Sequence, residues 1–417
     1  MAEVLNTDVI IAGAGMAGAT LALALQSGGL SVVMIDPQPF EAQVAPTFDG
    51  RASAIGFSCF RQWRALGAGE LIAPHAQRIE QILVTDGRMP GAAPGLVLSS
   101  FLRFDSAEIS DRTENEPLGY MVENRHIRAG LAEAVGRTDV RVLAPARVAA
   151  VDAEANQAIA TLEDGRSVRA PLLIGCDGRS SLVRQAAGIG VVGWPYGDLG
   201  VVATVQLERP HHGVAHEHFL PSGPFAILPL PDDRASLVWT EKAARGRALH
   251  AARPEVFHAH LNRRFGDLLG EARVAGGRFI YPLALELAER MTAPRIALLG
   301  DAAHGVHPIA GQGLNLGLKD CAALAQVLTE AARLGEDIGS EAVLDRYARW
   351  RRADNVSLAA ATDLFNRLYS NDFLPLRLAR GAGMALVNRI GPARRFFMRE
   401  AGGAVGDLPR LLRGETL

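Results

Sequence analysis

The fold is decided by the stretch VIIAGAGMAG at residues 9–18, where a short apolar run meets the glycine pattern Gly13-x-Gly15-x-x-Gly18. The sequence then predicts a helix over 19–26, ended by a glycine pair, and a second strand over 32–35, closed by Asp36. Parallel neighbours need a crossover helix, so this short strand–helix–strand unit predicts a parallel, doubly wound sheet. The expected fold class is therefore α/β, with a Rossmann-like first domain.

The same glycines indicate a dinucleotide site. They let the backbone turn tightly and approach a pyrophosphate, and the N-terminus of the following helix supplies N–H donors and a favourable dipole for that anion. Asp36, 18 residues beyond Gly18, is placed to accept hydrogen bonds from ribose hydroxyls and disfavours a 2′-phosphate. An accidental glycine-rich turn is the alternative. The motif alone does not separate NAD from FAD.

Composition excludes several classes of protein. The 417 residues are 48% apolar with a net charge of −2, which excludes a disordered chain and a uniformly basic nucleic-acid binder. The three cysteines are isolated and follow no CxxC pattern, which argues against a disulfide framework or structural zinc. No signal peptide and no run of 18 apolar residues is present, so we expect a cytoplasmic protein without a membrane-spanning helix.

The middle of the chain has a different pattern. Short, partly alternating strands are expected over 79–85, 200–208, 215–220, 224–229, 235–240 and 277–283, with one amphipathic helix over 254–270. This is typical of a mostly antiparallel sheet. The strand–helix pattern of the first domain then returns, with a buried strand over 295–299 and a long helix over 314–334. We therefore expect a discontinuous nucleotide-binding domain (1–75, 100–185 and 284–340), an inserted substrate-binding sheet domain (76–99 and 186–283), and a C-terminal helical segment (341–417).

A second motif follows the strand predicted over 172–174. Asp177-Gly178 would place a carboxylate and open backbone beside the first glycine turn. An Asx turn followed by a Ser181 N-cap is the alternative explanation for these residues.

The strongest motif runs from Gly300-Asp301 to Asp320. Asp301 ends a buried strand at the edge where ligands of doubly wound sheets bind, and is placed to hold a ribityl chain. Gly311 and Gly313 free the backbone to lie against a planar ring. The helix that starts near Leu314 points its positive end at that ring, which would stabilise the anion of a reduced flavin. A glycine-rich helix start without a ligand is the alternative.

Together these motifs resemble the aromatic-ring-hydroxylating flavin monooxygenases of the para-hydroxybenzoate hydroxylase fold. The run His-Pro-Ile-Ala-Gly-Gln-Gly-x-Asn-x-Gly-x-x-Asp at 307–320 resembles the signature of the ubiquinone-biosynthesis hydroxylases. The segments 49–55, 123–125, 364–366, 370–372 and 395–400 also look like that subfamily. The resemblance covers essentially the whole chain.

The resemblance implies specific roles. Asp36 would hold the adenosine ribose, the Val148 backbone would face the adenine, and Arg51 and Arg125 would lie near the pyrophosphate and ribityl chain. In full, the residues expected to bind FAD are Gly13, Gly15, Met16, Ala17, Gly18, Asp36, Arg51, Asn124, Arg125, Val148, Asp177, Gly178, Gly300, Asp301, Gly313, Leu314 and Asn315. Those expected around the reacting ring are His307, Pro308, Gly311, Gln312 and Gly313.

The implied activity is an FAD-dependent monooxygenase that hydroxylates the ring of a polyprenylphenol in ubiquinone synthesis. NAD(P)H would be the external reductant and O2 the co-substrate, through a flavin hydroperoxide; no second GxGxxG motif is present for a nicotinamide domain. Three alternatives stay open: a hydroxylase of a small soluble aromatic compound, a flavoprotein reductase or oxidase acting on prenyl chains, and a degenerate flavoprotein that only scaffolds a complex.

Two further groups of residues bear on partners. His211, His212, His216 and His218 are close in sequence but lack a neighbouring cysteine and have Glu217 as their one acidic neighbour, so we expect no metal. Residues 346–413 carry 13 arginines against 5 acidic residues, interleaved with apolar side chains. Such a segment suits contact with a membrane surface at the cytoplasmic face, or with a biosynthetic complex, besides ordinary core packing. No nucleic-acid partner is expected.

Overall fold

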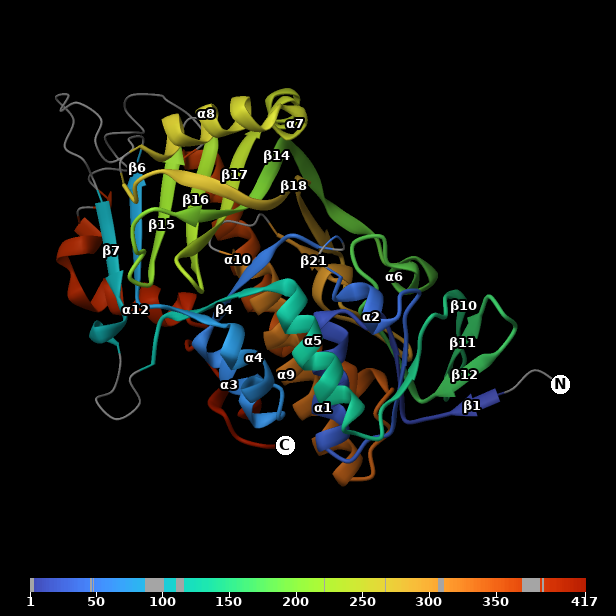
Figure 1. The fold of residues 1–417 in the computed structure, drawn as a ribbon. Helices are drawn as coiled ribbons and strands as arrows, with labels where there is room; N and C mark the ends of the chain where they lie inside the picture. Colours follow the sequence, from blue (N-terminus) through green and yellow to red (C-terminus); the bar gives the residue numbers. More distant parts are fainter. Residues whose placement is uncertain are drawn as a thin grey trace.

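A computed structural model describes residues 4–45, 47, 49–86, 101–109, 116–220, 222–266, 268–306, 311–369, 383–384 and 386–417. Two halves lie side by side, each built on its own large sheet (Figure 1). The first half contains a parallel sheet between helices and a small second sheet. The second half is a broad antiparallel sheet covered on one face by two helices.

A six-stranded sheet forms the centre of the first half. Its order is β19 (Thr292–Ala293), β20 (Ile296–Leu298), β13 (Leu172–Gly175), β2 (Val9–Ala12), β3 (Val32–Ile35) and β9 (Arg141–Leu143). All neighbours are parallel except β19 and β20. The parallel sheet expected from the sequence is confirmed, and the chain returns to it from three distant segments.

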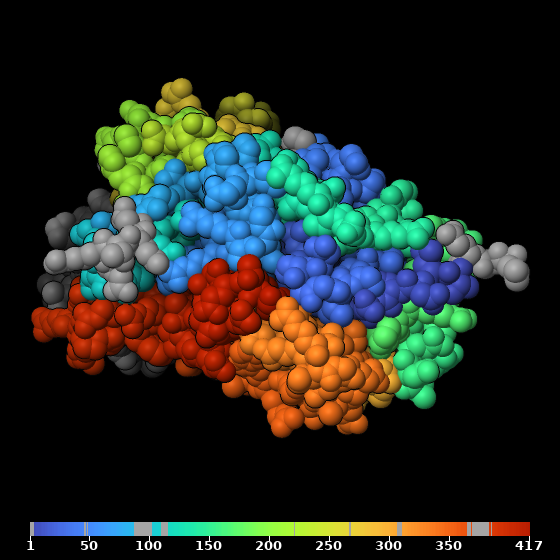
Figure 2. Space-filling model, turned by 90° about the horizontal axis from the view of Figure 1, so that it is seen from below, coloured from blue at the N-terminus to red at the C-terminus, as the bar shows by residue number. Residues whose placement is uncertain are grey.

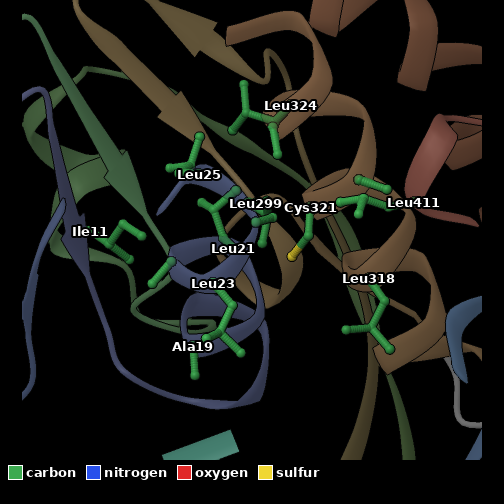
Figure 3. Packing of buried hydrophobic residues seen from close by; sticks show 14 of the residues in the cluster. Ile11, Ala19, Leu21, Leu23, Leu25, Leu299, Leu318, Cys321, Leu324 and Leu411 are labelled. Atoms are coloured by element: carbon green, nitrogen blue, oxygen red, sulfur yellow. The ribbon is translucent and has the colours of Figure 1, made fainter. Parts of the chain in front are cut away.

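Each face of this sheet is buried by a different layer. Helices α1 (Met16–Ser27), α5 (Asn124–Gly136) and α9 (Gln312–Arg333) cover one face, where Leu21 and Leu25 of α1 lie beside Leu324 and Cys321 of α9 (Figure 3). The other face packs on a four-stranded sheet of β1 (Val4–Asn6), β12 (Ser167–Ala170), β11 (Ala158–Leu162) and β10 (Val148–Ala153). Each fully buried leucine contributes about 1.5–3 kcal/mol, which makes this layered core the main source of stability.

The second half is an eight-stranded sheet. Its order is β21 (His304–Gly305), β18 (Ala272–Ala288), β14 (Val191–Leu207), β17 (Arg234–Lys242), β16 (Gly223–Leu230), β15 (Val214–Leu220), β6 (Gln81–Asp86) and β7 (Phe101–Asp105). Neighbours are antiparallel except β15 and β6. Helices α7 (Ala243–Ala251) and α8 (Pro254–Phe265) cover one face, where Phe257 and Phe265 pack on Phe225 and Trp239.

The opposite face of the large sheet meets the first half. A three-stranded sheet, β4 (Ala52–Gly56), β8 (Gly119–Glu123) and β5 (Gln77–Ile79), lies between them. Ala54 and Met121 of this small sheet cluster with Ala215 and Leu230 of the large one. Short helices α3 (Phe57–Ala65) and α4 (Gly69–Ile72) flank it, whereas α2 (Phe40–Gln43) packs on α5. Strand β4, which follows the Arg51 loop, therefore lies at the border of the two halves.

The C-terminal segment wraps under both halves. It contains α10 (Glu341–Tyr369), α12 (Gly391–Ala401) and the 3-10 turn η5 (Arg410–Arg413). Figure 2 shows this segment, in red, lying against the blue residues around α3. There the Ser58 hydroxyl donates to the Gly402 and Gly403 carbonyls at 2.9 and 3.0 Å. Among the helices that the structure describes, none combines the length and apolarity needed to cross a bilayer.

Several elements differ from the sequence expectation. The helix expected over 254–270 ends at Phe265, because Gly266 at φ +63° turns the chain. The strands expected over 200–208 and 277–283 are parts of the 17-residue strands β14 and β18. Helix α7 and the β10–β12 sheet were not expected, and β7 at 101–105 pairs within the large sheet.

Candidate functional site

The glycine turn after β2 contains one glycine that faces open space. Gly13 has φ +105°, and a Cβ there would lie 2.3 Å from the Cys176 carbonyl oxygen. A Cβ on Gly18 would lie 2.0 Å from the Gly13 oxygen, whereas a Cβ on Gly15 would meet nothing within 4 Å. Gly13 and Gly18 are therefore needed for packing, and Gly15 leaves room for a ligand.

Helix α1 begins at this turn without a capping side chain. Its N-cap is Gly15, and its first turn, which includes Met16 and Ala17, contains no acidic residue. The first N–H groups of a helix have no partner within the helix, and the dipole attracts an anion to them. The open side of Gly15 and the uncapped start of α1 together fit a phosphate group.

Asp36 ends β3 and hydrogen-bonds to the glycine turn. Its carboxylate accepts from the backbone N–H of Ala14 at 2.7 Å and of Gln38 at 2.8 Å. Its own carbonyl accepts from the Ala146 N–H at 2.8 Å, which brings the start of β10 at Val148 close to this strand end. The ribose and adenine contacts expected of Asp36 and Val148 stay predictions, with both residues placed at one end of the site.

Asp177, directly after β13, leaves one carboxylate oxygen without a partner. Oδ2 accepts from the Val183 N–H at 3.2 Å in α6 (Leu182–Ala186), but Oδ1 is buried with no hydrogen-bond partner among the described residues. Ser181 caps α6 by accepting from the Arg184 N–H at 2.9 Å. The capping explanation thus holds for Ser181, but it does not account for the unpaired Asp177 Oδ1. Because buried carboxylate oxygens are normally paired, this atom fits a donor on a ligand.

Asp301 lies at the neighbouring strand end. It sits in the 3-10 turn η3 (Gly300–Ala302) after β20, and its side chain is 55% exposed, with Arg179 Nε 3.9 Å away. Gly300 has φ +60°. A Cβ on Gly317 would lie 3.2 Å from the Gly300 Cα, so α9 passes directly over this turn. Glycine at 317 is what permits this close approach.

Helix α9 starts at the same edge of the sheet. Its N-cap is Gly311 at φ +64°, with no side-chain cap and no acidic residue in the first turn, so a second helix N-terminus is available to an anion. Gly313 follows in that turn, where a Cβ would come no closer than 3.8 Å to Val306. Leu314 packs on the core of the first half. His307 and Pro308, expected beside the ring, lie outside the described residues.

Two side chains that were predicted to line the site instead form hydrogen bonds with the protein backbone. The Asn315 amide donates to the Ala54 and Gly311 carbonyls at 2.7 and 3.2 Å, and its oxygen accepts from the Gly56 N–H at 2.8 Å. Gln312 reaches the Ala401 carbonyl of α12 at 3.4 Å. These side chains hold the start of α9 against β4 and the C-terminal segment, a role that the motif did not indicate.

A buried carboxylate, Asp49, organises the arginine loop. It accepts from Arg51 at 2.9 and 3.0 Å, from Asn124 at 2.8 Å and from Arg128 at 3.0 Å. Burial raises the pKa of Asp49, but hydrogen bonds from Arg51 and Asn124 and the charge of Arg51 outweigh burial and hold that pKa well below its usual range. Arg51 also stacks over the Tyr281 ring at 4.7 Å. Arg51 and Asn124 are thereby fixed together at the border of the two halves.

Asp49 and Arg128 were not identified from the sequence as site residues. Arg128 lies one helical turn after Asn124, a spacing that places both on one face of α5. The predicted Arg125 is not part of this cluster: it donates to Glu123 at 3.1 Å, and its Nε is buried with no hydrogen-bond partner among the described residues. The i, i+4 spacing was the signal that could have found Arg128.

A second buried cluster lies beneath Asp301. His304 Nε2 is 2.5 Å from Asp320 Oδ2, and Arg351 Nε donates to Asp320 Oδ1 at 2.7 Å. Burial raises the pKa of Asp320, yet the charges and hydrogen bonds of His304 and Arg351 lower it on balance. The cluster joins β21, α9 and α10, so His304 anchors the segment after η3 to α9 by a hydrogen bond.

The three loops meet at one edge of the parallel sheet and fit an elongated dinucleotide. β2, β13 and β20 are neighbours, so the turns that follow them, with Gly15, Asp177 and Asp301, lie in a row. The unpaired Asp177 Oδ1 offers an acceptor, and the starts of α1 and α9 offer donors and positive potential. This donor and acceptor set fits FAD, and it stays a prediction that the pyrophosphate binds at α1, the ribityl chain at Asp301 and the ring at α9.

Comparison with known proteins agrees with this geometry. The family model described as FAD binding domain matches residues 6–361. The ubiquinone hydroxylase UbiL of Rhodospirillum rubrum is 47% identical over 98% of this chain and 93% of its own length. The 3-demethoxyubiquinol 3-hydroxylase of Escherichia coli is 35% identical, covering 95% of this chain and 98% of that protein. The structure of p-nitrophenol 4-monooxygenase PnpA from Pseudomonas putida has the same fold, with a TM-score of 0.78 at 20% identity over 95% of this chain and 98% of that one.

Proposed function

Because the chain belongs to the FAD-binding domain family of FAD-dependent aromatic hydroxylases, we propose that it hydroxylates the ring of a polyprenylated phenol on the route to ubiquinone. The observation that carries the proposal is the row of Gly15, Asp177 and Asp301 along one sheet edge, with two uncapped helix starts beside it. The names of the two relatives, which match over nearly their whole length, support the substrate class.

Bound FAD, once reduced by NAD(P)H, would activate O2 and deliver one oxygen atom to the ring. The residues of the chain would bind FAD and orient its ring. Gly15 and the start of α1 would receive the pyrophosphate, and Asp301 the ribityl hydroxyls. Arg51, held by Asp49, would bring a fixed positive charge near the flavin ring expected at Gly311 and Gly313. The start of α9 at Gly311 would add the positive end of its dipole beside the flavin ring, where it would stabilise negative charge.

The apolar border between the halves suits a prenylated substrate. The residues that meet across it include Ala54, Met121, Ala215 and Leu230. A surface of this kind excludes water from the reacting ring, which protects the oxygen-transfer step from competing hydrolysis. An isoprenoid tail bound beside this border would contact apolar side chains.

We further propose that the chain works in the cytoplasm, at the membrane face that holds such a substrate. Helix α12 presents Phe396 and Phe397, 54% and 42% exposed, and Leu386 just before it is 59% exposed. Arg395 and Arg399 share this helix. Exposed aromatic and cationic side chains on one short helix suit an anionic bilayer surface. Co-sedimentation with anionic vesicles, compared between the natural chain and Phe396→Ser/Phe397→Ser, tests this contact.

The enzymatic proposal has a direct test. Purified protein is expected to be yellow, with a flavin absorbance spectrum, and to convert a prenylated phenol to the ring-hydroxylated product in the presence of NAD(P)H and O2. Mass spectrometry of the product after incubation with 18O2 shows whether one oxygen atom enters the ring. A flavoprotein that oxidises NAD(P)H without inserting oxygen contradicts the proposal and favours a reductase or oxidase.

A further inference from the structure

Glu217 lies on the face of the large sheet that is turned towards the FAD half. Side chains alternate along a strand, so Glu217 shares its face with Ala215, two residues earlier on β15. Ala215 clusters with Ala54 of β4, across the border of the two halves. His218 points to the opposite face, where its ring stacks on Phe225 beneath α8. Glu217 therefore lies on the sheet face beside the border at which the proposed function places the substrate.

The neighbours of Glu217 on this face are apolar. Its direct cross-strand partners are Val84 on β6 and Ala226 on β16. The strand registers extend the same row across the sheet to Val238, Val202 and Phe279. Phe279 in turn lies against Gly50, next to the Arg51 loop: a Cβ on Gly50 would lie 1.9 Å from its ring. The Glu217 carboxylate thus stands in an apolar row that ends at Phe279, beside the loop of the predicted cofactor residue Arg51.

No described residue forms an ion pair or hydrogen bond with the Glu217 carboxylate. Burial alone raises the pKa of Glu217 to about 8. Charged groups on the adjoining elements are engaged elsewhere: Asp86 on β6 has an interaction of its own, and Arg394 of α12 pairs with Glu108 at 2.7 Å.

The histidines on either side of Glu217 in the sequence do not supply a charge. Burial lowers the pKa of His216 to about 4, and burial, followed by the charge of His216, does the same for His218. Both rings are therefore neutral at physiological pH. An unpaired carboxyl in an apolar row is costly, and native proteins keep such groups mostly where a ligand or a reaction uses them.

We propose that Glu217 accepts the proton of the ring hydroxyl of the phenolic substrate, an inference that rests on the proposed function. The O–H bond of the substrate breaks, the proton bonds to a Glu217 carboxylate oxygen, and the electron pair stays on the ring oxygen. That oxygen then donates electron density to the ring carbon that is hydroxylated. A base near neutral pKa, surrounded by apolar side chains, suits this proton transfer.

Ligand binding gives a test that does not depend on turnover. The FAD-loaded protein is titrated, by flavin fluorescence, with a prenylated phenol and with its methyl ether, which has no proton to donate. Above pH 8 the natural chain is expected to bind the phenol about 10- to 100-fold more tightly, because a hydrogen bond to a charged acceptor is lost in the ether. Glu217→Leu is expected to bind the two ligands equally. A retained preference in that variant overturns the proposal.

Kinetics give the second test. Glu217→Gln keeps the side-chain shape but cannot take the proton, so kcat is expected to fall about 10²- to 10⁴-fold with little change in KM. The natural kcat should rise with pH through an apparent pKa near that of Glu217, and this rise should be absent in Glu217→Gln. Glu271→Gln, which removes an exposed carboxylate at the start of β18, is the matched control and should behave as the natural chain.

The outcomes separate this inference from the proposed function. If the natural chain neither binds nor hydroxylates the prenylated phenol, the proposed function is wrong. If the natural chain does both, and Glu217→Gln has the same kcat and pH profile, only the assignment of Glu217 is overturned. Partial recovery of kcat in Glu217→Asp, together with the lost phenol preference in Glu217→Leu, supports proton acceptance at this position.

Discussion

The Asn315 side chain donates a hydrogen bond to the Ala54 carbonyl oxygen at 2.7 Å, across 261 residues of sequence. The same amide oxygen accepts from the Gly56 N–H at 2.8 Å. These bonds lock the first turn of α9 to β4, so the glycines of that turn and the loop of Arg51 move as one unit. The asparagine of the motif thus positions the site without contributing a free side chain to it.

Asp301→Ala is expected to weaken FAD binding while leaving the fold intact. Its side chain is 55% exposed and makes no hydrogen bond in the described structure beyond a distant contact with Arg179 at 3.9 Å. Loss of one or two hydrogen bonds to ribityl hydroxyls should lower FAD affinity about 10- to 100-fold. Equilibrium titration of the apoprotein with FAD measures this. An unchanged affinity would show that the ribityl assignment is wrong; Asp164→Ala, on an exposed turn, is the control.

Gly15→Val is expected to give a folded protein without flavin. The backbone at Gly15 has φ −70°, and a Cβ there meets no protein atom within 4 Å, so the side chain fits the protein and obstructs only the ligand. Unfolding should occur at a lower temperature than in the holoprotein, because a ligand that binds the folded state is lost. A fully flavin-loaded Gly15→Val protein would falsify the pyrophosphate assignment.

Asp320→Asn is expected to lower the free energy of unfolding at pH 7 by up to about 3–5 kcal/mol, because it removes the ionised partner of the buried Arg351 Nε and leaves that guanidinium its ion pair with the more exposed Asp354 at 2.6 Å. The folded pKa of Asp320 is below its unfolded value, so its contribution is complete above about pH 4 and is lost as pH falls through the folded pKa. Urea unfolding of both proteins at pH 7 and pH 3 measures this. The stability difference should shrink at pH 3; a constant difference would contradict the ionised-pair account.

Affinity is expected to increase with the length of the isoprenoid tail. Each buried methylene contributes about 0.8 kcal/mol, so tail contacts along the apolar border should exceed ring contacts in total. Flavin fluorescence titrations with matched phenols of zero, one and several isoprene units test this. Equal affinity along the series would favour the hydroxylase of a small soluble aromatic compound.

The parallel sheet and its ligand edge were predictable from local sequence. Glycine patterns after short apolar runs specify a turn, a helix start and a strand end within about ten residues. Asp177 and Asp301 were found because each lies within three residues of the end of a strand whose neighbours could be inferred. These predictions needed only chain-local geometry and the rule that ligands bind at the carboxyl ends of parallel strands.

The residues that were missed depend on contacts between distant segments. Asp49 becomes important only because Asn124 and Arg128, on α5, close over it. The isolation of Glu217 follows from the strand registers that put Val84 and Ala226 beside it. In the sequence, Glu217 stood out only as the one acidic neighbour of four histidines at which no metal was expected. Its apolar surroundings depend on the pairing of strands far apart in the chain, which no local pattern encodes.

The position of Leu411 and Leu412 has a consequence for how the chain acquires its structure during synthesis. Both are fully or almost fully buried in the same core cluster as Leu21 and Leu25 of α1, and Figure 3 shows Leu411 beside Leu318. The helices made first therefore keep an open hydrophobic surface until some four hundred residues have left the ribosome. A nascent chain in this interval exposes apolar side chains to aggregation, and chaperone capture of the emerging N-terminal helices would protect it.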